Sequence, residues 1–233
     1  MQNRLNLDFP LTLEFEIINM EIGIFTFNDF SENTYVLSDE SGQCIIIDPG
    51  CNTEKERNQL ADYISAKNLT PVRLINTHCH IDHVLGNRFV TENYRLELEA
   101  HEGEIPVLES CIMVASMYHI PYNPSPIITK KIEEKDIIKF GKTSLEVLFT
   151  PGHSPASISL YNKENNALIA GDVLFKRSIG RTDLPGGSFN TLKASIQNKL
   201  YVLPDETVVF PGHGPSTTIG EEKRENEFVR ALI

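Results

Sequence analysis

The sequence predicts an α/β fold, a four-layer helix–sheet–sheet–helix sandwich. Three observations predict it: strand and helix patterns alternate in both halves of the chain, many strands are joined by short hairpins, and the 233 residues suffice for a large core. Because hairpins join many of the strands, we expect two mixed sheets rather than purely parallel ones. No apolar run approaches the roughly 18 residues that a membrane span requires.

In the first half, short apolar or alternating runs predict strands, and helical periodicity predicts helices. The expected strands are 21–27, 34–38, 43–47, 72–76 and 96–100. The expected helices are 53–67, 87–94 and 105–118. Thr53 is a suitable N-cap for the first helix. Three prolines at 121, 124 and 126 predict a loop after the third.

The second half repeats the interleaving of strands and helices. The expected strands are 136–140, 143–150, 157–162, 167–170 and 207–210. The expected helices are 190–200 and a charged closing helix, 220–233. Each half therefore supplies one sheet, whose outer face helices must cover.

Charge and cysteine usage restrict the partners and the compartment. The chain has 21 basic and 32 acidic residues and a net charge of −11, which disfavours nucleic acids and acidic membrane surfaces. Its four cysteines form no CxxC pair. Acidic residues interrupt residues 1–19 where a signal peptide would need an apolar core. We therefore expect a reduced, cytoplasmic protein.

Three of the seven histidines, His78, His80 and His83, lie within six residues, with Asp82 beside them. Histidine is the commonest metal ligand, so this cluster predicts a metal site. After a strand end, residues i and i+2 point to one side, so His78 and His80 suit one ion. Asp82 and His83 then face a second position close by.

Two more histidines share a local context. His153 lies in Thr-Pro-Gly-His-Ser-Pro and His213 in Phe-Pro-Gly-His-Gly-Pro, each after a predicted strand. Active-site loops collect at such strand ends, so both are candidate ligands. His101 and His119 have no such context, and we expect them to be structural.

Asp172 follows the apolar run 167–171. A carboxylate at the end of a buried strand is costly to desolvate unless it is paired or metal-bound, although it could also cap a helix. One carboxylate can bridge two cations. The seven candidates offer nitrogen and oxygen donors without thiolate, which suits zinc, manganese or iron. We expect Cys79 to point away and pack.

The run His-x-His-x-Asp-His at 78–83, followed in order by His153, Asp172 and His213, resembles the metallo-β-lactamase superfamily over residues 20–233. Asn-Thr-Tyr at 33–35 and Ile-Asp-Pro-Gly at 47–50 also resemble its opening strands. The family fold is an αββα sandwich. An aspartate at 172 together with His213 resembles glyoxalase II-type hydrolases rather than true β-lactamases. The sequence motifs within 171–187 and 211–215 resemble those of a short branch of the glyoxalase II group, the hydroxyacylglutathione hydrolase-like proteins.

The resemblance assigns roles to these positions. It implies a first divalent ion, zinc by preference, on His78, His80 and His153. It implies a second on Asp82, His83 and His213. Asp172 would bridge the two ions, Asp82 would also orient the nucleophile, and Asp48 would steady the histidine loop.

The chain also departs from full-length glyoxalase II. It is too short for the C-terminal helical domain that supplies basic groups for glutathione. Arg181 and Asp183 stand where the family has a lysine and a nearby aromatic residue. Arg181 remains a candidate for binding a substrate carboxylate. The thiol and the acyl group of the substrate, and the oligomeric state, stay open.

The leading expectation is hydrolysis of a small-molecule thioester, such as S-lactoylglutathione or a related acyl thiol, by a metal-bridged hydroxide. The alternative is a persulfide dioxygenase. These enzymes share the Gly-Arg-Thr-Asp motif and bind one iron ion on the equivalents of His78, His153 and Asp172. A nuclease is disfavoured by the acidic charge and by the absence of a clamping insertion. A non-catalytic binding module is disfavoured by the complete ligand set.

Residues 1–19 are expected to be an N-terminal extension whose native status stays open, because strand periodicity and family resemblance both begin at Met20. Residues 20–233 form the expected single domain. Deleting residues 1–19 should leave the melting temperature and the activity nearly unchanged, which calorimetry and a metal-dependent assay measure. Loss of soluble protein on deletion would show instead that the segment packs into the core.

Overall fold

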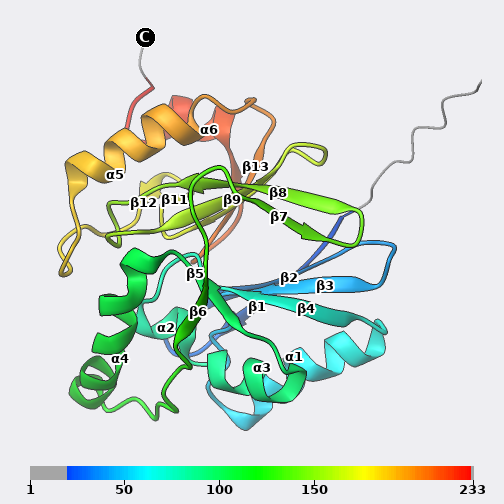
Figure 1. Ribbon diagram of the computed structural model, residues 1–233. Helices are drawn as coiled ribbons and strands as arrows, with labels where there is room; N and C mark the ends of the chain where they lie inside the picture. Colours follow the sequence, from blue (N-terminus) through cyan, green and yellow to red (C-terminus); the bar gives the residue numbers. More distant parts are fainter. Residues whose placement is uncertain (1–19, 232–233) are drawn as a thin grey trace, which may run out of the picture.

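The structure, a computed structural model, describes residues 20–231. Two sheets pack face to face, and helices cover both outer faces (Figure 1). This four-layer sandwich with two mixed sheets confirms the predicted fold. The expectation for residues 1–19 lies outside the described residues.

The first sheet has six strands in the order β1-β2-β3-β4-β5-β6. They are β1 (Glu21–Phe27), β2 (Glu32–Ser38), β3 (Gln43–Ile47), β4 (Thr70–Ile75), β5 (Leu98–Ala100) and β6 (Ile128–Lys131). The first three are antiparallel, and β3 to β6 are parallel. Strand β6 has no clear sequence pattern and was not predicted, because its residues are mostly exposed and it follows a proline-rich loop.

Helices cover the outer face of this sheet (Figure 1). They are α1 (Glu54–Ala66), α2 (Ile81–Val84), α3 (Asn87–Tyr94) and α4 (Ile105–Tyr118), with a 3₁₀ turn at Glu102–Glu104 before α4. As predicted, Thr53 caps α1, and Glu56 completes a capping box. Tyr63 of α1 packs edge-on against Phe25, with ring centroids 5.1 Å apart.

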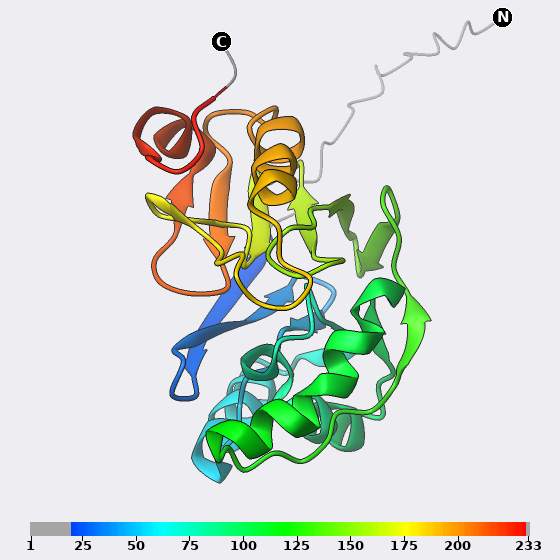
Figure 2. The same cartoon turned by 90° about the vertical axis from the view of Figure 1, so that its left-hand side faces the viewer.

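The second sheet has the order β14-β13-β10-β9-β8-β7. Its strands are β7 (Ile137–Phe140), β8 (Thr143–Phe149), β9 (Ile158–Asn162), β10 (Ala167–Gly171), β13 (Val208–Pro211) and β14 (Thr217–Thr218). A separate hairpin joins β11 (Leu174–Phe175) to β12 (Ser178–Ile179). The outer face is covered by α5 (Phe189–Ser195), which continues as a π-helical turn over Ile196–Leu200, and by α6 (Ile219–Glu225). In Figure 2, α4 and α5 lie on opposite outer layers.

The predicted closing helix, 220–233, was wrong in its length. The helix ends at Glu225, because the Asn226 side chain accepts hydrogen bonds from the backbone N–H groups of Phe228 and Val229. Such a turn gives the backbone an alternative to further helix. Residues 232–233 lie outside the described part of the chain.

A shared apolar layer holds the two sheets together. Large side chains of β2 and β3, including Tyr35, Leu37 and Ile45, pack against β7 to β10. Phe210 of β13 meets Tyr35 edge-on at 6.1 Å between ring centroids. The Tyr35 hydroxyl donates to the Pro211 carbonyl at 2.6 Å. The first sheet therefore fixes the end of β13, the point from which the His213 loop leaves.

No helix within residues 20–231 is both long and apolar enough to cross a bilayer. All four cysteines are buried and free, as expected of a chain without a disulfide framework.

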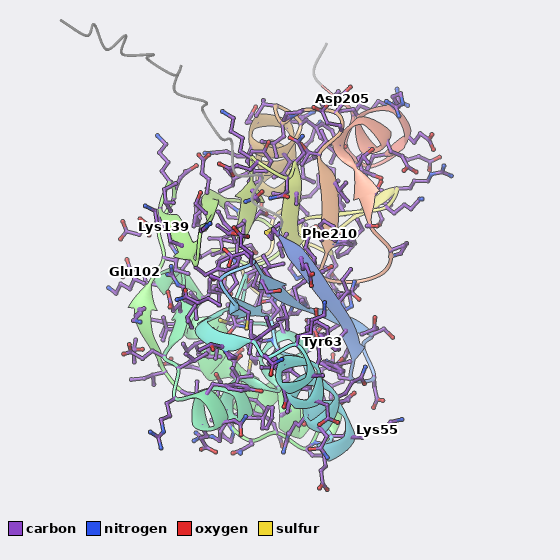
Figure 3. The ribbon with its side chains drawn as sticks, turned by 90° about the vertical axis from the view of Figure 1, so that its right-hand side faces the viewer. Lys55, Tyr63, Glu102, Lys139, Asp205 and Phe210 are labelled. Atoms are coloured by element: carbon purple, nitrogen blue, oxygen red, sulfur yellow. The ribbon has the colours of Figure 1, made fainter. Side chains whose placement is uncertain are left out.

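Thr53→Ala removes the side-chain cap of α1 and half of its capping box. The free energy of unfolding should fall by about 1 kcal/mol, the usual cost of losing an N-cap. Urea denaturation measures this change. Lys55→Ala, at an exposed position of the same helix, is the control and should change stability by less than about 0.5 kcal/mol (Figure 3). Equal losses in the two variants would show that the cap contributes nothing.

Candidate metal centre

Each candidate ligand follows the carboxyl end of a strand. His78 and His80 follow β4, and Asp82 and His83 lie on the short helix α2 that comes next. His153, Asp172 and His213 follow β8, β10 and β13 of the other sheet. The two sheets end at one shared edge, so the structure brings six of these side chains into two adjoining groups and places Asp172 near both.

The first group comprises His78, His80 and His153, whose ligand atoms lie within 4.8 Å of one another. His80 Nδ1 is 2.8 Å from His153 Nε2. Burial, reinforced by the neighbouring His153, lowers the pKa of His80 to about 4. Three neutral imidazoles therefore converge, and neutral imidazole is the form that binds a metal ion.

The second group comprises Asp82, His83 and His213. Asp82 Oδ2 lies 3.1 Å from His213 Nε2 and 3.6 Å from His83 Nε2. Burial disfavours a charged His83, but the carboxylates of Asp82 and Asp172 outweigh burial and raise its pKa. This position therefore favours a positive charge.

Asp172 lies between the two groups. Its Oδ1 is 3.5 Å from His83 Nε2, and its Oδ2 is 3.5 Å from both His153 Nε2 and His213 Nε2. Burial alone would raise its pKa, but the positive charge of His83 holds it well below the usual value. Asp172 is followed by β11, so it does not cap a helix.

The donor atoms fit a metal centre. His78 Nε2, His83 Nε2 and Asp172 Oδ1 are buried and have no hydrogen-bond partner in the protein. Buried polar atoms are nearly always satisfied, so three such atoms in one cluster require an explanation. Divalent metal ions would satisfy them, and the donor set of imidazole nitrogens and carboxylate oxygens suits such ions.

Hydrogen bonds on the far side of the rings orient them. Asp48 accepts from the Thr77 backbone N–H at 2.7 Å, and its Oδ2 lies 3.3 Å from His83 Nδ1. His153 Nδ1 donates to the Arg181 carbonyl at 2.8 Å, and His213 Nδ1 donates to the Phe30 carbonyl at 3.0 Å. Each Nε2 consequently points into the cluster, an arrangement typical of metal-binding histidines.

Glycine at 212 is required by the close approach of two loops. A Cβ atom there would lie 2.0 Å from Asp172 Oδ1 and 2.8 Å from His83 Cε1. The Asn33 amide group holds this loop in place by donating to the carbonyls of Pro211 and Gly214.

Arg181 lies at the rim of the cluster. Its guanidinium donates two hydrogen bonds to Asp183, at 2.8 and 2.7 Å, and both side chains are largely exposed. The Arg181 carbonyl accepts a hydrogen bond from His153 of the first group, so the ion pair of Arg181 and Asp183 lies beside that group. The structure thus brings Arg181 near the candidate ligands and pairs it with Asp183.

Three other side chains lie as expected. Cys79 is buried in the core beneath the first sheet. His101 accepts from the Gly103 N–H at the start of the 3₁₀ turn and stacks on Phe149. His119 is exposed at the C-terminus of α4. All three are structural here.

Two buried acids were missed. Glu32 is fully buried, and its Oε1 lies 3.9 Å from His83 Nδ1 without a hydrogen-bond partner. Glu104 is also fully buried and contacts both histidine loops. Neither has a local pattern that separates it from the many exposed acids of this chain. Long-range contacts alone reveal them.

The model of the metallo-beta-lactamase superfamily matches residues 27–213. A "Probable metallo-hydrolase YqgX" of Bacillus subtilis is 39% identical over 200 residues, which are 85% of this chain and 92% of the relative. "Hydroxyacylglutathione hydrolase GloC" of Haemophilus influenzae is 33% identical over 214 residues, 91% of this chain and 99% of the relative.

Solved structures agree in fold. "BLEG-1 B3 metallo-beta-lactamase" has a TM-score of 0.81 at 32% identity and covers 90% of this chain and 99% of its own. "TTHA1623 in a di-iron-bound form" has a TM-score of 0.80 at 35% identity over 89% of this chain and 100% of its own. "ETHE1 from Myxococcus xanthus" has a TM-score of 0.73 at 27% identity, with coverages of 89% and 83%.

If Asp172 joins two metal ions, Asp172→Ala should release the second ion, because two cations would repel each other without the shared anion. His213→Ala should lose the second ion and keep the first. Plasma emission spectroscopy of the purified variants measures metal per chain. His119→Asn, a change at an exposed histidine, is the control and should keep the wild-type content. Full metal content in both His213→Ala and Asp172→Ala would contradict the assignment.

Proposed function

The chain belongs to the metallo-β-lactamase superfamily, and on that premise we propose that it is a thioesterase using two divalent metal ions. Its substrate is a small acyl thiol of the S-lactoylglutathione type. The main support for this proposal is the position of Asp172, whose two carboxylate oxygens face His83 on one side and His153 on the other. A relative named as a hydroxyacylglutathione hydrolase, 33% identical over 99% of its length, supports the substrate class.

Two ligand sets follow from this proposal. The first ion is held by His78, His80 and His153, the second by Asp82, His83 and His213, and Asp172 contributes to both. Zinc is the proposed metal because it readily binds sites in which imidazole nitrogens are combined with carboxylate oxygens. Iron and manganese accept the same donors, and one similar solved structure is described as di-iron-bound.

The bound ions would supply a water of lowered pKa and a Lewis acid for the thioester carbonyl. The residues of this chain do the positioning. Asp82, whose carboxylate is 13% exposed, orients the attacking water and accepts its proton. Asp48 fixes the orientation of the His83 ring, and the Arg181 carbonyl fixes that of the His153 ring. The leaving group is a thiolate, which needs no strong general acid, and no such acid stands in the cluster.

The test is an assay of purified protein with S-lactoylglutathione, in which free thiol is trapped as it forms, together with metal analysis. We expect thiol release, about two ions per chain, and loss of activity on chelation that zinc restores. Asp172→Ala is the inactive control. A single bound iron, with oxygen consumed in the presence of a persulfide and no thioester cleaved, would instead establish the dioxygenase alternative.

Arg181 is proposed to bind a substrate carboxylate, in competition with Asp183. Arg181→Ala should raise KM for S-lactoylglutathione by up to about fivefold, the equivalent of the 0.2–1 kcal/mol of an exposed ion pair, with little change in kcat. A thioester of N-acetylcysteamine, which lacks carboxylates, is the matched control substrate and should show no change. Equal changes for both substrates would remove Arg181 from carboxylate recognition.

A further inference from the structure

We propose that Glu104 is a positioning residue that joins the loops carrying His78, His80 and His153 and thereby sets the metal affinity of that group. The inference rests on the metal centre of the proposed function and adds a residue to it. Glu104 lies in the 3₁₀ turn before α4 and is 0% exposed.

The carboxylate of Glu104 accepts hydrogen bonds from both loops. The backbone N–H of Cys79, which stands between His78 and His80, donates to Oε2 at 2.9 Å. The Ser154 hydroxyl lies 2.7 Å from each oxygen, and the Ala156 N–H donates to Oε1 at 2.8 Å. Ser154 directly follows His153. One side chain therefore joins a loop of the first sheet to a loop of the second, beside all three histidines of the first group.

The side-chain hydrogen bonds of Glu104 all go to residues of the two loops that carry this group. None of its hydrogen-bond partners is adjacent to Asp82, His83 or His213. Two of its partners are backbone N–H groups in fixed positions, so an acceptor is needed at both carboxylate oxygens. A glutamine would turn its own NH₂ group toward one of these donors. Glu104→Gln should therefore distort the first group while preserving the size of the side chain.

Loss of an outer hydrogen-bond partner typically costs about 10–100-fold in metal affinity. We expect a loss of this size at the first group in Glu104→Gln. The measurement is titration with zinc against a competing chelator, in a His213→Ala background that leaves only the first ion. The temperature is held well below the melting point of each variant. Excess zinc should restore occupancy of Glu104→Gln, because the site is weakened but the protein stays folded.

Glu222→Gln in the same background is the matched control. Glu222 is also 0% exposed and accepts from the Thr217 hydroxyl, the Asn226 amide and the Arg177 N–H, on the far side of the second sheet. It should lower the melting temperature and leave zinc affinity within about twofold. If Glu104→Gln does not fold, Ser154→Ala, which removes only the hydroxyl bonds, should give a smaller loss in the same direction.

Wild-type zinc affinity in Glu104→Gln, or in Ser154→Ala where Glu104→Gln does not fold, would overturn the proposal. So would equal losses in Glu104→Gln and Glu222→Gln, since burial of an acid would then explain both. The readout is binding, so it is independent of the substrate. If the wild-type protein binds zinc but cleaves no thioester, the proposed function fails and the role of Glu104 is still decided by the titration.

Discussion

The carboxylate of Asp172 is the contact on which the rest of the site depends. It is buried among imidazoles that come from both sheets, and it lies 3.5 Å from His83 on one side and from His153 on the other. Two cations a few ångströms apart repel each other strongly in a site with little water, and the proposed sharing of one anion between them lowers that repulsion. Removing this one side chain would leave two half-sites without a common ligand.

The fold supplies the precision of this arrangement. Four strands from two sheets end at the same edge, and the apolar layer between the sheets fixes their separation. Hydrogen bonds then set the loops: Asn33 holds the His213 loop, Asp48 orients His83, and Glu104 joins the loops of the first group. These acceptors and donors lie outside the set of candidate ligands, yet they determine where the ring nitrogens of that set point.

The sequence was informative where the signal is local. The cluster at 78–83, the paired Pro-Gly-His turns and Asp172 at the end of an apolar strand were all visible as patterns, and Thr53 was visible as a cap. Strand β6 was not visible as a pattern, because pairing with β5 stabilises it. The end of α6 was not visible either, because a turn formed by the Asn226 side chain ends the helix. Glu32 and Glu104 were also not visible, since burial by distant segments distinguishes them from exposed acids.

The central claim is that one carboxylate bridges two ions. A crystal structure of the zinc-loaded protein, with anomalous data collected on both sides of the zinc edge, tests it most directly. The account predicts two anomalous peaks about 3.5–4 Å apart, each about 2.0–2.2 Å from an oxygen of the Asp172 carboxylate. A single peak bound by His78, His153 and Asp172, with Asp82 and His213 free of metal, would contradict it.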